Sequence, residues 1–414
     1  MSKHILLQLL FRIINIILNL TVGIYIINYL GPNEQGQLAF AINTVGMLTF
    51  LTTLGIGSHY AKVMSNTSCM YNINEIKSIL LFLRMLGCIL LSVVVAVVLI
   101  VFSKENLASL IAIIVLARFI FAFNIYHDIF EGKGLMDKYA IINIVVALVI
   151  AMFRCVCIFY DLGLLYIAFS YALEQFMTLL VSWVYFDKYK YFPIKLNLEK
   201  SKHVFLKVFP LCMSSIVISI FTQIDVFLIG VIQGNTEVGV YSSALKVVTP
   251  LYFFGSLVMS VYFNKLNQLY KCNEALFHEE VSKLSGFLIL ISTICVMLIY
   301  AFGDELFKGL FDKDFHEGVD IFKWLVLVLP FVYLGPVTGK YLIITGDYKA
   351  EFNKTSVACL INIVLGLILI PIFGGQGAAI GTVISYFFAN YGFFLFNKKH
   401  RKLLNNINRL GVIR

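Results

Sequence analysis

Long apolar stretches, separated by short polar connections, run through the whole chain. A bilayer core takes about 20 apolar residues per helix, and marking stretches of that length predicts twelve membrane-spanning helices. The predicted spans are 5–30, 37–61, 79–102, 107–130, 140–160, 163–186, 205–232, 239–263, 284–302, 321–345, 355–373 and 378–396. The alternating ten-residue pattern of a transmembrane β-barrel is absent from the sequence, so the predicted class is an all-α polytopic membrane protein.

Composition supports the same class. The 414 residues are 60% apolar and 13% charged, with a mean hydropathy of +0.89, whereas soluble domains are about 45–50% apolar and about 25% charged. This excludes a soluble catalytic domain. The eight cysteines follow no zinc-binding or redox spacing, so no metal site and no cofactor is predicted.

The basic residues predict the orientation. Outside the membrane, 22 Lys and Arg fall in the termini and the even-numbered connections, counting Lys207 at the edge of its span, and three fall in the odd-numbered ones. The positive-inside rule therefore predicts cytoplasmic termini and an even number of spans. The basic tracts are explained as topology signals beside anionic headgroups, and nucleic-acid binding is not predicted.

The two halves of the chain repeat. Gly31-Pro-Asn-Glu34-Gln-Gly36 with Ala41 matches Gly234-Asn-Thr-Glu237-Val-Gly239 with Ala244, and all four identities are offset by 203 residues. Farther on, Asn143-Ile-Val matches Asn362-Ile-Val, and Ser170-Tyr171 matches Ser385-Tyr386. Six spans per repeat imply two six-helix bundles related by a pseudo-two-fold axis along the membrane normal, as in many transporters. The predicted domains are residues 1–195 and residues 196–414, the second with a short basic cytoplasmic tail.

These motifs carry a family resemblance. Tyr29-Leu-Gly-Pro-Asn-Glu-Gln-Gly36, and Asp225-Val-Phe-Leu-Ile-Gly230 running into Glu237-Val-Gly-Val-Tyr241, resemble the Wzx-type flippases of O-antigen and other bacterial surface polysaccharides. The resemblance implies the fold shared by MATE exporters and the lipid II flippase MurJ. It also implies transport of an undecaprenyl-pyrophosphate-linked oligosaccharide repeat unit across the bacterial inner membrane, from the cytoplasmic to the periplasmic leaflet, with H⁺ or Na⁺ coupling. Membrane lipids, a polysaccharide polymerase and chain-length proteins are the implied partners.

Charged residues inside the spans fit an anionic substrate. Seven are basic (Arg12, Arg84, Arg118, Arg154, Lys246, Lys323, Lys340) and three are acidic (Asp128, Glu174, Asp225). Such residues are costly in lipid and commonly mark a transport path. Arg84, Lys323 and Lys340 lie near predicted membrane boundaries, where snorkelling explains them.

The first span carries a polar stripe. At 100° per residue, Gln8, Arg12, Asn15 and Asn19 fall on one helix face. We expect this face to line a cavity, with interhelical hydrogen bonding as the alternative. Arg12 and Arg154 are the predicted pyrophosphate ligands, because guanidinium groups bind phosphate oxygens in a bidentate manner.

Depth matching suggests partners for the remaining charges. Arg118 and Glu174 lie at similar distances from the outer boundary, and so do Asp225 and Lys246. We expect each pair to be neighbours or to share one aqueous cavity, in a structural or an ion-coupling role.

Two alternatives to a flippase stay open at this point. The first is a MATE-like drug/cation antiporter, which the excess of basic residues fits poorly. The second is a membrane enzyme, such as a polysaccharide polymerase or glycosyltransferase, and the acidic outer connection 303–320 is the only feature that favours it.

Overall fold

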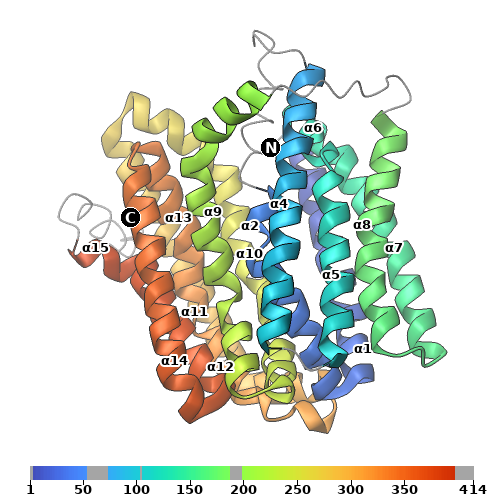
Figure 1. The fold of residues 1–414 in the computed structure, drawn as a ribbon. Coiled ribbons are helices and arrows are strands. Elements are labelled where there is room, and N and C mark those ends of the chain that lie inside the picture. Colours follow the sequence, from blue (N-terminus) through green and yellow to red (C-terminus); the bar gives the residue numbers. More distant parts are fainter. Residues whose placement is uncertain (1–2, 54–72, 103–104, 187–197, 397–414) are drawn as a thin grey trace. The chain divides into compact units, whose positions relative to one another are not determined.

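The computed structural model describes residues 3–53, 73–102, 105–186 and 198–396, without the side chains at several helix ends. These residues are helical, as predicted, and contain no strand (Figure 1). The helices are α1 (Lys3–Met47), α2 (Phe50–Thr53), α4 (Ile73–Phe102), α5 (Glu105–Phe123), α6 (Tyr126–Gly132), α7 (Met136–Phe159), α8 (Leu164–Phe186), α9 (Leu198–Ile232), α10 (Asn235–Cys272), α11 (Glu274–Leu310), α12 (Gly318–Val326), α13 (Leu329–Ile344), α14 (Tyr348–Phe387) and α15 (Phe393–Phe396), with the short 3₁₀ turn η2 (Lys313–Phe315) and the π-helical turn η3 (Phe388–Gly392).

Ten helical segments in the described part of the chain are long and apolar enough to cross a membrane. Large apolar side chains also cover their outer faces; Phe159, for example, is 83% exposed and Met152 is 68% exposed. Such a surface is stable in lipid, because its apolar area is not exposed to water. Helices also satisfy the hydrogen-bonding groups of their backbone without water. The chain is therefore a multi-pass membrane protein.

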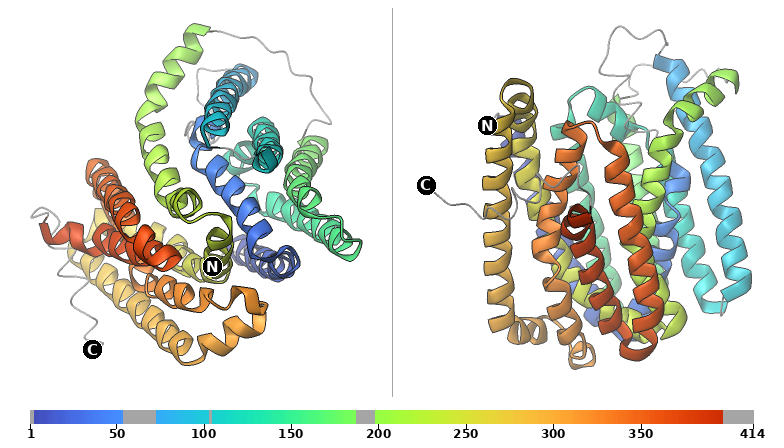
Figure 2. Two further views of the ribbon diagram at one scale, coloured as in Figure 1. Left: turned by 60° about the horizontal axis from the view of Figure 1, so that its bottom comes forward. Right: turned by 90° about the vertical axis from the view of Figure 1, so that its left-hand side faces the viewer.

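Two of the long helices are broken at a glycine. Gly31 interrupts α1 with a φ of 69°, and Gly374 interrupts α14 with a φ of 56°. Positive φ angles are strained for residues with a Cβ, which explains glycine at both breaks. The two arms of α14 pack side by side (Figure 2), so that Gly381 in the second arm lies against Asn362 in the first. This hairpin brings residues from both arms to one place.

The contacts divide the chain into two compact units, residues 1–30 with 37–223 and residues 31–36 with 224–414. The division falls inside α9, later in the chain than the predicted boundary at 195/196. In the first unit α5 packs against α4 and α8, and α7 packs against α8; α7 and α8 form a visible pair in Figures 1 and 2. One of its apolar clusters, built on Ile79, Ile129, Phe130 and Ile150, joins α4, α6 and α7.

In the second unit α10 packs against α11, α12, α13 and α14. The two copies of the glycine motif meet here. A Cβ on Gly36 would lie 1.7 Å from the backbone oxygen of Asn235, and a Cβ on Gly239 would lie 1.9 Å from that of Pro32. Because residues 32 and 235 differ by the same 203 positions as residues 36 and 239, the contact is reciprocal. Glycine at both places permits this close backbone approach.

Candidate functional site

A buried carboxylate in the second unit receives hydrogen bonds from three uncharged side chains. Asp225 lies near the end of α9 and is 9% exposed. Asn362 Nδ2 donates to its Oδ1 at 2.8 Å, and Thr382 Oγ1 donates to its Oδ2 at 2.8 Å. Tyr241 OH, from α10, donates to the same Oδ2 at 3.4 Å. We call Asp225 and these three donors the Asp225 cluster.

The broken helix α14 builds this cluster. Asn362 is on its first arm and Thr382 is on its second, so only the hairpin brings both to α9. A further layer lies behind them, because Ser385 Oγ is 3.3 Å from Asn362 Oδ1. Carboxylate, amide and hydroxyl oxygens are the ligand types of small hard cations, and a buried carboxylate also accepts a proton. The cluster is therefore chemically suited to a monovalent cation or H⁺.

Lys246 was expected to be a neighbour of Asp225 or to share an aqueous cavity with it, and the observed hydrogen-bond donors to Asp225 are other residues. The ion pairs among the described residues do not include Asp225 with Lys246, which is half-buried on α10. Depth matching compares residues at one level of the membrane and does not reveal which helix faces meet. The sequence distances from Asp225 to its partners, 137 and 157 residues, hid them.

The first unit holds a second membrane carboxylate, and this one is neutralised. Arg154 on α7 is 6% exposed; its Nη2 donates to Glu174 Oε2 at 3.0 Å and its Nε donates to Ser170 Oγ at 2.8 Å. Its guanidinium also lies 4.6 Å from the ring centroid of Tyr171. We call these four residues the Arg154 cluster.

Of the two possibilities expected for Arg118 and Glu174, a direct ion pair is not observed, because Glu174 pairs with Arg154; a shared aqueous cavity stays a prediction. Counted from the connection between α7 and α8, the two observed partners differ in depth by about five residues, or about 7.5 Å. The long arginine side chain crosses that difference. Within the described residues, Arg118 on α5 is half-buried and makes no hydrogen bond or ion pair.

The polar stripe of the first span is described only in part. Asn19 Nδ2 donates to Asn15 Oδ1 at 2.6 Å and to the Asn15 backbone oxygen at 2.9 Å, and both residues are half-buried on α1. The side chains of Gln8 and Arg12 lie outside the described residues.

Arg84 does not snorkel as predicted. Its guanidinium is buried, with Nη2 2.6 Å from Asp128 Oδ2 and Nη1 directed at the backbone oxygens of Ala122 and Asn124. These oxygens lose their helical hydrogen bonds where α5 ends and α6 begins. Arg84 replaces those bonds and so stabilises the break between the two helices. Sequence reasoning missed this role, although Asp128 was a visible acid on a nearby span.

Three ligand-type side chains gather at the same break. Atoms of His127, Asp128 and Glu131 lie within 4.8 Å of one another. Asp128 is already neutralised by Arg84, which leaves the exposed Glu131 as the one remaining carboxylate of the three. The arrangement is accounted for as a structural ion pair with exposed polar neighbours.

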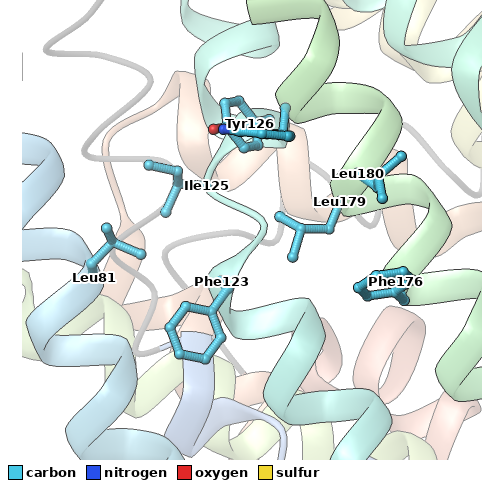
Figure 3. Close-up of a pocket in the computed structure, with 8 residues that line it drawn as sticks. Leu81, Phe123, Ile125, Tyr126, Phe176, Leu179 and Leu180 are labelled. Atoms are coloured by element: carbon cyan, nitrogen blue, oxygen red, sulfur yellow. The ribbon is translucent and has the colours of Figure 1, made fainter. Parts of the chain in front are cut away.

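An apolar cavity of about 430 Å³ lies beside this break (Figure 3). Helix α8 contributes one face to it, α4 contributes one residue, and the α5–α6 connection forms the rest. The lining residues are Leu81, Phe123, Ile125, Tyr126, Phe176, Leu179, Leu180 and Trp183. Without a charged group in its lining, the cavity suits hydrocarbon and not a phosphate or an ion.

The chain matches two family models over more than half of its length each. The first, described as polysaccharide biosynthesis protein, matches residues 1–263. The second, described as lipid II flippase MurJ, matches residues 191–411.

Curated relatives are similar over part of their length. The capsular polysaccharide biosynthesis protein CapF of Staphylococcus aureus is 27% identical over 254 residues, which are 58% of this chain and 64% of CapF. The probable low-salt glycan biosynthesis flippase Agl15 of Haloferax volcanii is 25% identical over 173 residues, 40% of this chain and 35% of Agl15. The chain thus spans less than two thirds of either relative.

Solved structures share the fold. Lipid II flippase MurJ in an inward closed conformation has a TM-score of 0.78 at 17% identity, covering 98% of this chain and 90% of MurJ. An inward-facing MATE multidrug transporter has a TM-score of 0.73 at 16% identity, covering 98% and 99%. The expected MurJ- and MATE-like fold is confirmed, and the family matches show that the chain belongs to the polysaccharide biosynthesis protein family, with its second half also matching the MurJ family.

Proposed function

We propose that the protein is a flippase that moves an undecaprenyl-pyrophosphate-linked oligosaccharide from the cytoplasmic to the outer leaflet by alternating access. The family and its relatives, one named for capsular polysaccharide and one for a glycan flippase, support a lipid-linked sugar as cargo. O-antigen and capsular repeat units are both within this class. The proposed location is the inner membrane, and a polymerase and chain-length proteins are the proposed partners.

The proposed topology has twelve spans and cytoplasmic termini. Ten long helical segments are described, and α1 and α14 each contain a break at the place where the sequence separates two spans. Counting the arms of each separately gives twelve, and an even number agrees with the charge distribution. We propose two six-helix bundles around one central cavity.

The main support for an anionic substrate is that Arg118 has no ion-pair partner among the described residues. A cation inside a membrane helix is costly unless it is paired or hydrated, and Arg118 has no partner among the described residues whereas Arg84 and Arg154 do. A pyrophosphate would supply the missing negative charge through charge-assisted hydrogen bonds. We propose Arg118 as a pyrophosphate ligand, together with Arg12 and the asparagines Asn15 and Asn19. Arg154 is already neutralised by Glu174, so we propose that it does not supply the positive charge that binds the pyrophosphate.

The Asp225 cluster is the proposed site of coupling. A carboxylate held only by neutral donors leaves one negative charge uncompensated in the membrane, and binding of Na⁺ or H⁺ would remove that cost. Lys246 and Glu174 are proposed to be structural.

The test is complementation of a strain that lacks its polysaccharide flippase, with Arg118→Ala, Arg118→Lys and a matched control, Lys138→Ala, which removes an exposed positive charge from the first turns of α7. At equal membrane abundance, loss of a charge-assisted contact predicts about a tenfold drop in polymer for Arg118→Ala. Lysine retains the positive charge without the bidentate geometry of the guanidinium group, so Arg118→Lys should impair transport less than Arg118→Ala does. Complete lipid-linked repeat units should accumulate on the cytoplasmic face.

The same strains separate the alternatives. Normal polysaccharide with altered resistance to cationic drugs would favour the drug antiporter, whose fold the chain shares. Wild-type polymer from Arg118→Ala would overturn the assignment of Arg118.

A further inference from the structure

Two side chains outside the proposed coupling site form hydrogen bonds to the backbone of α14 on either side of its break. Gln233, just after α9, donates from Nε2 to the backbone oxygen of Ile370 at 2.9 Å. Glu237, in the first turn of α10, accepts from the backbone N–H of Gly375 at 2.6 Å. Backbone groups freed by a helix break need such partners inside a membrane protein, since no bulk water replaces them. Glu237 therefore caps the start of the second arm of α14, where a carboxylate also faces the favourable end of the helix dipole.

Helix α10 links this cap to the Asp225 cluster. Tyr241 follows Glu237 by four residues, so both side chains lie on one face of α10. Glu237 binds the break while Tyr241 donates to Asp225. Thr382, the donor on the second arm, follows Gly375 by seven residues, about 10 Å along a rigid helix. The cap thus determines where Thr382 stands relative to Asp225.

We propose that Glu237 is a positioning residue that sets the cation affinity of the Asp225 cluster through the second arm of α14. This inference rests on the proposed coupling role of Asp225. Without the cap, the second arm is free to shift or fray from Gly375 onward, and Thr382 then loses its 2.8 Å contact with Asp225. Glu237 itself does not touch the carboxylate of Asp225.

The repeat provides a matched control. Glu34 occupies the position equivalent to Glu237 in the first glycine motif, 203 residues earlier. It is exposed, and among the described residues it makes no hydrogen bond or ion pair. Removing its carboxylate changes the surface charge by the same amount without touching α14.

The experiment is a Na⁺ titration of the thermal stability of the purified full-length protein in nanodiscs, with K⁺ held as the balancing ion. A ligand that binds only the folded state raises the melting temperature with its concentration. Asp225→Asn is the variant without a site. We expect Glu237→Ala to raise the Na⁺ midpoint about tenfold, equivalent to about 1.4 kcal/mol, and Glu34→Ala to leave it unchanged.

Two further variants separate positioning from folding. Glu237→Gln keeps an oxygen that accepts from Gly375 and should restore a midpoint near that of the wild type. Glu237→Asp keeps the charge on a shorter side chain and should raise the midpoint, which tests the proposal even where the alanine variant does not fold. A lower melting temperature with an unmoved Na⁺ midpoint in both Glu237→Ala and Glu237→Asp would overturn it.

A wild-type protein without any Na⁺ response would refute Na⁺ coupling at Asp225, not the role of Glu237. Hydrogen exchange in Na⁺-free buffer then decides. Faster exchange of amides 375–386 in Glu237→Ala, but not in Glu237→Gln or Glu34→Ala, supports the positioning role. Unchanged exchange in Glu237→Ala overturns it.

Discussion

The two carboxylate clusters each hold a carboxylate within a helix long and apolar enough to cross the membrane, and they stabilise it in different ways. Glu174, in the first unit, faces a guanidinium at 3.0 Å. Asp225, in the second unit, faces an amide and two hydroxyl groups. The exposure differs as well, because the Glu174 side chain is 28% exposed whereas Asp225 is buried.

The difference in net charge separates the two roles. The Arg154 cluster is electrically neutral, because each charge has its counter-ion within the protein. The Asp225 cluster has a charge of minus one when its carboxylate is ionised. Keeping that charge out of water costs several kcal/mol, so the cluster is more stable with a small cation or a proton bound. This difference supports the proposal that the Arg154–Glu174 pair is structural and that the Asp225 cluster exchanges a cation or a proton.

Of the variants that test this comparison, Asp225→Asn should have the largest effect, a loss of transport. The amide has nearly the shape of the carboxylate, so the fold persists, but it has no negative charge for a cation. We expect about a 100-fold loss of transport at normal membrane abundance, near the upper range of coupling between two sites. Appearance of the lipid-linked oligosaccharide in the outer leaflet is the measurement. Glu174→Gln is the counterpart in the other cluster, and an equal loss in both variants would show that the distinction between them is false.

The helical membrane fold was accessible from the sequence because twenty-residue apolar stretches have one stable form in lipid. The motifs around Gly31 and Gly234 identified the family, which the comparisons confirm. The count of twelve spans stays a prediction. The positions of the breaks were also visible, since Gly31 and Gly374 fall between predicted spans.

Side-chain partners were not accessible in the same way. Asp225 was recognised as a membrane acid, and Asn362 and Ser385 were noticed only as repeat matches. Their meeting depends on how the arms of α14 rotate against α9, which no spacing along one helix reveals. Depth matching compares residues at the same level but does not reveal which helix faces meet, and for this reason it did not identify Arg154 as the ion-pair partner of Glu174.

Arg154→Ala should have the next largest effect, on stability instead of transport. It leaves Glu174 without its counter-ion. Breaking a fully buried pair costs about 3–5 kcal/mol, and because the Glu174 side chain is 28% exposed we expect the lower end, about 3 kcal/mol. Thermal unfolding in detergent is the measurement, and the double variant Arg154→Met with Glu174→Gln should recover most of the loss. Arg118→Ala, which breaks no pair, should unfold as the wild type does.

Ser385→Ala should have the smallest effect and gives the finest test of the comparison. The Ser385 hydroxyl lies 2.7 Å from the Gly381 backbone oxygen and 3.3 Å from Asn362 Oδ1, and its single proton serves one of them at a time. Removing it loosens the orientation of Asn362 without removing a ligand of Asp225. A weak neutral hydrogen bond contributes about 0.5–1 kcal/mol, which predicts about a two- to fivefold rise in the Na⁺ midpoint.

Ser292→Ala is the control for Ser385→Ala, because Ser292 is equally buried on α11 but bonds only to Ile289 of its own helix. Its loss should leave the Na⁺ midpoint unchanged. If both serine variants move the midpoint equally, the effect comes from general loosening of the second unit. If only Ser385→Ala moves it, the orientation of Asn362 contributes to affinity, and the layer behind the Asp225 cluster belongs to the cation site. No such graded response is expected around Glu174, because its charge is already balanced by Arg154.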